Sequence, residues 1–269
     1  MANDDKLSNL STAAQNTAVI KTNGEFIQRS GSESDIDESL REMFQQHGFS
    51  TGPQWAYHAN AYLKRQALSR ILYLDEIYRS IVSVPGVICE FGVQYGATTA
   101  LLTNLRGIYE PYNHSRHIYG FDTFEGFSTV VAKDGTFSDQ GDYAVPERYE
   151  EQLESLLGLH EANAPLSHIT RYHLVRGDAS VTVPAWIEAN PHVVVSLAIL
   201  DMDVFQPTRD VLEAIKPRLV KGSIVVFDEM NCPHFPGETL AALEVFGLNN
   251  LALRRHPHQP YCSWARIGD

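Results

Sequence analysis

Acidic side chains follow two apolar runs of the chain, where their types and spacing could hold a cation. LAILDMDVF places Asp201 and Asp203 after one run, and GSIVVFDEM places Asp228 and Glu229 after another. If both runs are neighbouring parallel strands, about 4.8 Å apart, their acids meet at one sheet edge. Carboxylates so crowded repel one another, and Mg²⁺ prefers such oxygen ligands. The pattern predicts a Mg²⁺ site; the alternative is a set of separate helix caps and surface acids.

An earlier apolar run ends in an acid and a glycine-containing turn, VICEFGVQYGATTALL. Gly92 and Gly96 would let a ligand approach the backbone between strand and helix, and Glu90 could accept a hydrogen bond from a ligand's ammonium group. Thr98, just inside the following helix, is a further candidate for cofactor binding. Glycines at such turns are also common for structural reasons. The missing GxGxxG disfavours a nicotinamide dehydrogenase.

Two further acids end predicted strands. Asp122, at the end of IYGFD, stands where a Rossmann-like sheet binds ribose hydroxyls, although it could instead be a cap or turn residue. Asp178, in LVRGDAS, could accept the exocyclic amine of an adenine or N-cap a helix beginning near Val181.

Alternating strands and helices would position these residues. Strands are predicted at 86–91, 117–121, 172–175, 193–200, 223–227, 251–254 and 261–267, and helices at 97–108, 146–159, 181–189, 208–219 and 238–248. This order predicts an α/β fold with a doubly wound, seven-stranded Rossmann-like sheet. The loop HPHQP is too short for a helical crossover, so the last strand should be antiparallel to its neighbour.

The region ahead of this sheet differs in composition. Residues 1–37 are polar and predict a flexible N-terminal arm, with a short ordered piece at 25–28. Residues 38–82 carry apolar side chains at helical spacing and predict a helical layer, which leaves 83–269 as the α/β domain.

Composition limits the classes of partner. A formal charge of −12 without a basic stripe argues against nucleic-acid binding. Three scattered cysteines suggest neither a disulfide framework nor a zinc site, and Cys89, inside an apolar run, is expected to be buried. No secretory signal is visible, and the longest apolar stretch is too short to span a bilayer, which predicts a cytoplasmic protein without a membrane partner.

From about residue 50 onward, these motifs resemble the macrocin O-methyltransferase family, whose members methylate sugars of macrolide and aminocoumarin antibiotics. The resemblance rests on EFGVQYG, DTFEGF, LDMD, KPRLVKGSIVVFDE and YCSWARI. It implies a class I methyltransferase that uses S-adenosylmethionine and Mg²⁺ in antibiotic biosynthesis. In this family, the acids matching Asp201, Asp228 and Glu229 hold the metal, and the one matching Asp203 is the proposed general base.

The chain also departs from the family pattern. Glu229 stands where a second aspartate is usual, and Tyr95 where a basic residue or tryptophan is usual. The N-terminal helices and the loop 123–145 match no family pattern, although the acceptor is expected to bind there. His234, just beyond the acidic pair, is the alternative candidate for the base if Asp203 is a metal ligand.

The predicted function is Mg²⁺-assisted O-methylation of a sugar hydroxyl, on a nucleotide-linked sugar or a glycosylated natural product, by a homo-oligomer. One alternative is a metal-dependent O-methyltransferase of phenolic or catechol acceptors, and another is an enzyme of the related cephalosporin-hydroxylase-like group. A third is an inactive methyltransferase fold serving as a binding subunit. The intact acidic set argues against this last alternative, because an inactive site has no reason to keep a costly cluster of charges.

Overall fold

The computed structural model describes residues 17–22, 25–48, 52–259 and 261–269. The chain divides into two compact units, residues 1–68 and 69–269. The sequence pattern predicts the corresponding division at residue 82. Helix α4 (Arg65–Ile81) crosses the observed division, so most of the last predicted N-terminal helix belongs to the unit that contains the large sheet.

The N-terminal unit holds more regular structure than its polar sequence suggests. Strands β1 (Thr17–Thr22) and β2 (Glu25–Ser30) pair antiparallel, and α2 (Gly31–His47) begins within the segment predicted to be an arm. The other elements are η1 (Gly52–Gln54), α3 (Trp55–His58) and η2 (Ala59–Tyr62). Residues 1–16 and 23–24 of the predicted arm lie outside the described residues. Strand β2 contains the short ordered piece expected at 25–28, but strands of six residues with mixed polarity carry too little periodicity for the hairpin to be predicted from sequence.

The second unit is built on a seven-stranded sheet, as predicted. Its order is β5-β4-β3-β6-β7-β9-β8. The strands are β3 (Val87–Phe91), β4 (Ile118–Asp122), β5 (Tyr172–Arg176), β6 (Val195–Leu200), β7 (Leu219–Phe227), β8 (Arg254–Arg255) and β9 (Ser263–Arg266). The first five pair in parallel, whereas β9 runs antiparallel to both β7 and β8. Strand β8 differs clearly from the prediction, because it is two exposed arginines instead of the expected apolar stretch.

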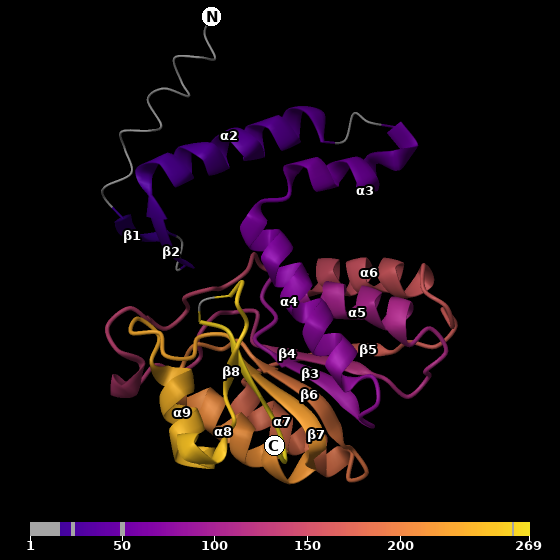
Figure 1. The fold of residues 1–269 in the computed structure, drawn as a ribbon, viewed down its shortest axis with the longest axis vertical. Helices are drawn as coiled ribbons and strands as arrows, with labels where there is room; N and C mark the ends of the chain where they lie inside the picture. The colour runs from indigo at the N-terminus through magenta and orange to yellow at the C-terminus, as the bar shows by residue number, and fades with distance from the viewer. Residues whose placement is uncertain (1–16, 23–24, 49–51, 260) are drawn as a thin grey trace, which may run out of the picture. The chain divides into compact units, whose positions relative to one another are not determined.

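Helices cover both faces of this sheet (Figure 1). Helices α7 (Ala179–Ala189), α8 (Phe205–Ile215) and α9 (Gly237–Phe246) pack on one face, with Phe91 and Leu200 in the same apolar cluster. Helices α4 and α5 (Ala97–Tyr109) pack on the other face with Ile88 and Ile199. Helix α6 (Tyr149–Ala162) packs near the β5 side. Among the described residues, no helix is long and apolar enough to cross a membrane.

Short turns connect these helices to the sheet. The η3 turn (Ala132–Asp134) brings the Asp134 carboxylate to the first turn of α8, where it accepts a hydrogen bond from Phe205 N at 2.5 Å. This cap satisfies an N–H that has no partner within the helix, and α8 begins three residues before its predicted start at 208. After α8 and α9, the turns η4 (Lys216–Arg218) and η5 (Leu248–Asn250) lead into the last strands.

Backbone hydrogen bonds hold the carboxyl ends of the central strands at the same level of the sheet. Asp201 N donates to Phe91 O at 2.8 Å, Asp228 N donates to Leu200 O at 3.1 Å, and Gly92 N donates to Phe121 O at 2.9 Å. Gly92 has φ +92°, and a Cβ at this position would lie 1.8 Å from Asp201 O. The close approach of β3 to β6 at this edge therefore requires glycine.

Gly92→Ala should lower the free energy of unfolding by more than about 2 kcal/mol, since it adds a backbone clash to left-handed strain. Gly141→Ala is a matched control, because Gly141 has φ +85° and no atom lies within 4 Å of where its Cβ would stand, so the substitution adds strain alone. We expect the control to cost about 1 kcal/mol. Urea unfolding of both variants measures the difference. Equal losses of the free energy of unfolding in the two variants would mean that the close approach of β3 to β6 does not require glycine at position 92.

Candidate active site

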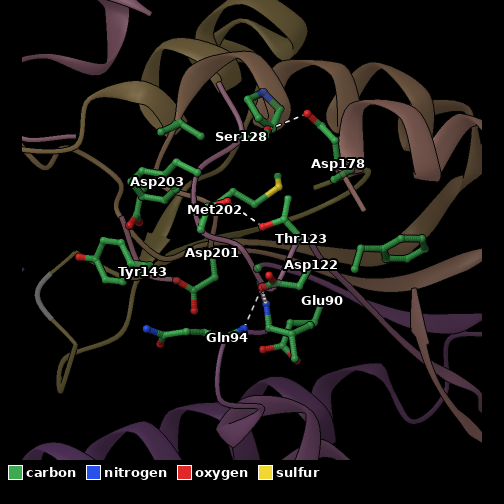
Figure 2. A pocket seen from close by; sticks show the side chains of 18 of the residues that line it. Glu90, Gln94, Asp122, Thr123, Ser128, Tyr143, Asp178, Asp201, Met202 and Asp203 are labelled. Carbon is green, nitrogen blue, oxygen red and sulfur yellow. Dashed lines mark hydrogen bonds between the residues drawn. The ribbon is translucent and has the colours of Figure 1, made fainter. Parts of the chain in front are cut away.

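A cavity of about 310 Å³ opens at the carboxyl edge of the sheet. Seven predicted site residues line it: Glu90, Gly92, Thr98, Asp122, Asp178, Asp201 and Asp203. Figure 2 shows Asp201 and Asp203 on one side of the cavity and Glu90 and Asp122 on the other. Four predicted residues are not part of the wall: Gly96, Asp228, Glu229 and His234.

Glu90 lies at the end of β3 and is 1% exposed. Its carboxylate accepts a hydrogen bond from Thr99 Oγ1, and burial raises its pKa to about 8. A cationic ligand group at the cavity would favour the charged form of this carboxylate. Glu90 can therefore serve the predicted role of binding an ammonium group.

Asp122 organises the glycine-containing turn. Its Oδ2 accepts hydrogen bonds from Val93 N at 2.6 Å and Gln94 N at 2.8 Å, while its Oδ1 accepts one from Phe124 N at 2.6 Å. Gln94, one of these donors, has a left-handed φ of +48°. Asp122 thus fixes the loop on which a ligand would rest, in addition to lining the cavity where the sequence predicts a ribose partner.

Asp178 takes the N-cap position that the sequence offered as one of two alternatives. Its Oδ1 accepts a hydrogen bond from Ser180 N at 2.8 Å, and α7 begins at Ala179, two residues before its predicted start. Its Oδ2 accepts a hydrogen bond from Ser128 Oγ at 2.6 Å, which fastens the 123–145 loop to the cavity (Figure 2). The cap does not exclude the adenine role, because Asp178 also lines the cavity.

A guanidinium group joins two of the predicted metal ligands. Arg70, on α4, donates to Asp201 Oδ2 at 2.9 Å and also to Asp228 Oδ1. It further donates to Thr98 Oγ1 at 3.2 Å. Burial and the neighbouring Asp228 carboxylate raise the pKa of Asp201, and Arg70 opposes both effects. Asp201 and Asp228 therefore lie close enough to share one cation.

Asp203 reaches the cavity by a different path from the expected one. The sequence pattern places it on a chain that stays extended beyond Asp201, but β6 ends at Leu200 and Asp203 has a left-handed φ of +61°. Its side chain nevertheless lines the same cavity. Burial, followed by the charge of Asp201, raises the pKa of Asp203. A buried carboxylate with a raised pKa has the properties of a general base.

Glu229 and His234 do not line this cavity. Glu229 Oε2 is buried without a hydrogen-bond partner, and burial, followed by the Asp228 charge, raises the pKa of Glu229 to about 7. The His234 ring packs edge-on against Phe137, with 4.5 Å between centroids. The described structure thus brings Asp203, but not His234, to the cavity.

Comparisons with known proteins decide the family. Residues 89–230, which span more than half of the chain, match the family described as "Methyltransferase domain". The chain belongs to this methyltransferase family. Its fold is similar to that of CalS11, a calicheamicin methyltransferase, at 37% identity and a TM-score of 0.85, covering 95% of this chain and 100% of CalS11.

A second solved structure supports the same relationship. Apo CalS11, described as a TDP-rhamnose 3'-O-methyltransferase, matches at 36% identity and a TM-score of 0.80, over 90% of this chain and 97% of that one. The O-methyltransferase NovP shares the fold at 17% identity and a TM-score of 0.57, over 74% and 79% of the two chains. The comparison with curated proteins found no match.

The cavity of this methyltransferase suits the cofactor that its fold implies. S-adenosylmethionine carries a cationic sulfonium and an ammonium group, and the wall presents the carboxylates of Glu90, Asp122 and Asp201. Gly92 also lines this cavity. The charge of the wall therefore fits the cofactor.

The oxygen donors at this edge of the sheet suit Mg²⁺, but in the described residues they are not arranged as a metal site. Asp201 and Asp228 already share one cation, and the unpartnered buried oxygen of Glu229 is a further hard donor. However, within the described ranges no three acidic, histidine or cysteine side chains converge as a metal site requires. The guanidinium of Arg70 lies between two of the three predicted ligands.

Glu238 connects the two acidic loops, and sequence reasoning missed it. This side chain is fully buried at the start of α9 and accepts hydrogen bonds from Met202 N at 3.3 Å, Asp203 N at 3.4 Å and Glu229 N at 3.1 Å. Burial and the Asp203 charge raise its pKa, while the N-terminus of α9 favours an acid there. Acids are common near helix N-termini, so nothing in the sequence distinguishes this one.

Glu238→Ala should remove acceptors from three backbone N–H groups and lower the free energy of unfolding by about 2–3 kcal/mol. It should also reduce methyl transfer, because the Asp203 and Glu229 loops lose their common anchor. Glu244→Ala is the matched control on the same helix, since Glu244 is 45% exposed and pairs with Lys133 at the surface; we expect it to cost less than about 1 kcal/mol. Chemical unfolding and initial rates measure both effects. Comparable losses in the two variants would contradict the anchoring role.

Proposed function

We propose that this methyltransferase transfers the methyl group of S-adenosylmethionine to a hydroxyl of a sugar, carried by a nucleotide or a glycosylated natural product. The observation that carries the proposal is the similarity to CalS11 over 95% of this chain and all of that one. The match extends beyond the cofactor domain into the N-terminal region, where we expect the acceptor to bind. CalS11 itself is a TDP-rhamnose 3'-O-methyltransferase.

The acceptor side of the cavity is supported by the loop that follows β4. Thr123, Phe127, Ser128 and Tyr143 all line the cavity. These aromatic and hydroxyl groups could pack on a sugar ring and hydrogen-bond its hydroxyls. The loop 123–145 and the helical layer 38–82 remain our predicted acceptor-binding segments.

Catalysis requires a hydroxyl oxygen to attack a methyl group while its proton leaves. S-adenosylmethionine, when bound, supplies an activated methyl group. The proposed role of Asp203 is to accept the hydroxyl proton as the O–CH₃ bond forms and the S–CH₃ bond breaks, which would leave S-adenosylhomocysteine as the second product. The glycine turn would hold the cofactor and the acceptor loop would orient the hydroxyl, which reduces the entropic part of the barrier.

We further propose that Asp201, Asp228 and Glu229 hold Mg²⁺ during turnover. Mg²⁺, when bound, would supply the positive charge that makes a poorly acidic sugar hydroxyl easier to deprotonate. The support is the oxygen-donor set and the sharing of one cation by Asp201 and Asp228.

Incubation with TDP-rhamnose and S-adenosylmethionine should give a methylated sugar nucleotide, detected by mass spectrometry. The rate should fall to background in EDTA and recover with Mg²⁺. Catechol is the comparison acceptor. Methylation of catechol without any sugar product would contradict the acceptor proposal, and full activity in EDTA would contradict the Mg²⁺ proposal alone.

Asp203→Asn retains the shape of the side chain but removes its ability to accept a proton. We expect kcat to fall by about 10²–10⁴-fold, with binding of S-adenosylmethionine and the Mg²⁺ requirement little changed. Asp228→Asn is the contrasting variant, in which the Mg²⁺ concentration for half-maximal rate should rise. If saturating Mg²⁺ restored the rate of Asp203→Asn, Asp203 would be a metal ligand instead of the base.

A further inference from the structure

We propose that Arg70 is an exchangeable internal cation of the acidic cluster, which neutralises Asp201 and Asp228 in the metal-free protein and must withdraw when a divalent cation binds. This inference rests on the Mg²⁺ part of the proposed function and adds a residue that competes with the metal. It concerns α4, which the sequence associates with the N-terminal helical layer and not with the acidic cluster.

The geometry places one guanidinium on the oxygens of both acids. Arg70 Nη2 lies 2.9 Å from Asp201 Oδ2, and Nη1 pairs with Asp228 Oδ1. The planar fork of arginine suits such bridging of two carboxylates. A metal held by the same two carboxylates would meet a positive charge already in contact with its ligands. If the metal ion bound while Arg70 kept this position, the metal ion and the guanidinium would lie in contact and repel each other.

Charge balance explains why an arginine is present at this position. Asp201 and Asp228 carry like charges and both contact the same guanidinium, which offsets the repulsion between them. Among the described residues, no Lys, Arg or His other than Arg70 forms an ion pair with either acid. Without a cation these two acids would repel each other, so the guanidinium stabilises the empty site.

The same contacts remain accessible for exchange. The side chains of Arg70, Asp201 and Asp228 keep 28%, 30% and 16% of their surface exposed, and Arg70 and Asp201 both line the cavity. By contrast, Glu238 and Glu90 are buried, with exposed fractions of 0% and 1%. A hydrated ion can thus reach the bridged pair through the cavity. A guanidinium does not lose its proton in proteins, so it can leave the acids only by moving.

Direct binding of Mn²⁺, a spectroscopic substitute for Mg²⁺, tests the exchange without measuring turnover. Free Mn²⁺ is followed by electron paramagnetic resonance during titration of the full chain and of Arg70→Met. If the paired state reduces the metal-competent fraction to a tenth or less, the variant should bind Mn²⁺ about tenfold more tightly or better. Arg79→Met is the matched control, because Arg79 lies on the same helix, is 65% exposed and contacts only Asp75 among the described ion pairs. The control should bind like the wild type.

Thermal unfolding supplies a second readout and guards against misfolding. Arg70→Met should melt below the wild type in EDTA, and Mn²⁺ should raise its melting temperature by more than that of the wild type, because the metal replaces the lost cation. Arg70→Lys keeps the charge without the fork and should show intermediate Mn²⁺ affinity. This second variant carries the test if the methionine variant does not fold.

Equal or weaker Mn²⁺ binding by Arg70→Met, with an equal or smaller thermal shift, would overturn the exchange and leave the Mg²⁺ proposal intact. Mn²⁺ binding by the variant but not the wild type would support it most strongly. If neither protein bound Mn²⁺, the exchange and the Mg²⁺ proposal would both fail. Methylation of TDP-rhamnose in EDTA would then show separately whether the sugar acceptor proposal survives.

Discussion

Repulsion among carboxylates at one edge of the sheet is the constraint on which the rest of the site depends. Asp201, Asp203, Asp228 and Glu229 follow two adjacent parallel strands, and burial raises the pKa of three of them. A fold can keep such a set only by supplying positive charge or hydrogen-bond donors. The guanidinium of Arg70 supplies the charge on the cavity side. Three backbone N–H groups of the two acidic loops, those of Met202, Asp203 and Glu229, donate to Glu238 and hold the loops in place.

The same edge also has to leave space for a ligand. The strands end in step because Asp201 and Asp228 extend the backbone hydrogen bonding of β3, β6 and β7. Gly92 permits this close approach, and Asp122 holds the following turn through three backbone N–H groups. The result is a cavity with a fixed glycine-containing floor and an acidic wall. Rigid backbone on one side and charged side chains on the other is the arrangement expected for binding a cationic cofactor beside a reacting hydroxyl.

Much of this arrangement could be predicted from the sequence, because it depends on local pattern. Apolar runs alternating with helical periodicity predict the parallel sheet, and the pairing of β6 with β7 brings Asp201 near Asp228. The turn after β6 could not be predicted, because the left-handed conformation of Asp203 depends on its tertiary contacts and not on its residue type. Arg70 and Glu238 were also missed. Each contacts acids or loops that are distant along the chain, Arg70 by 131 and 158 positions, and local pattern carries no information about such pairs.

Calorimetric titration of the full chain with S-adenosylmethionine tests the central claim that this edge of the sheet is a methyltransferase cofactor site. The account predicts saturable binding at one site per chain, competition by S-adenosylhomocysteine, and no heat from NAD⁺. Saturable binding of NAD⁺, with no response to S-adenosylmethionine at millimolar concentration, would contradict it.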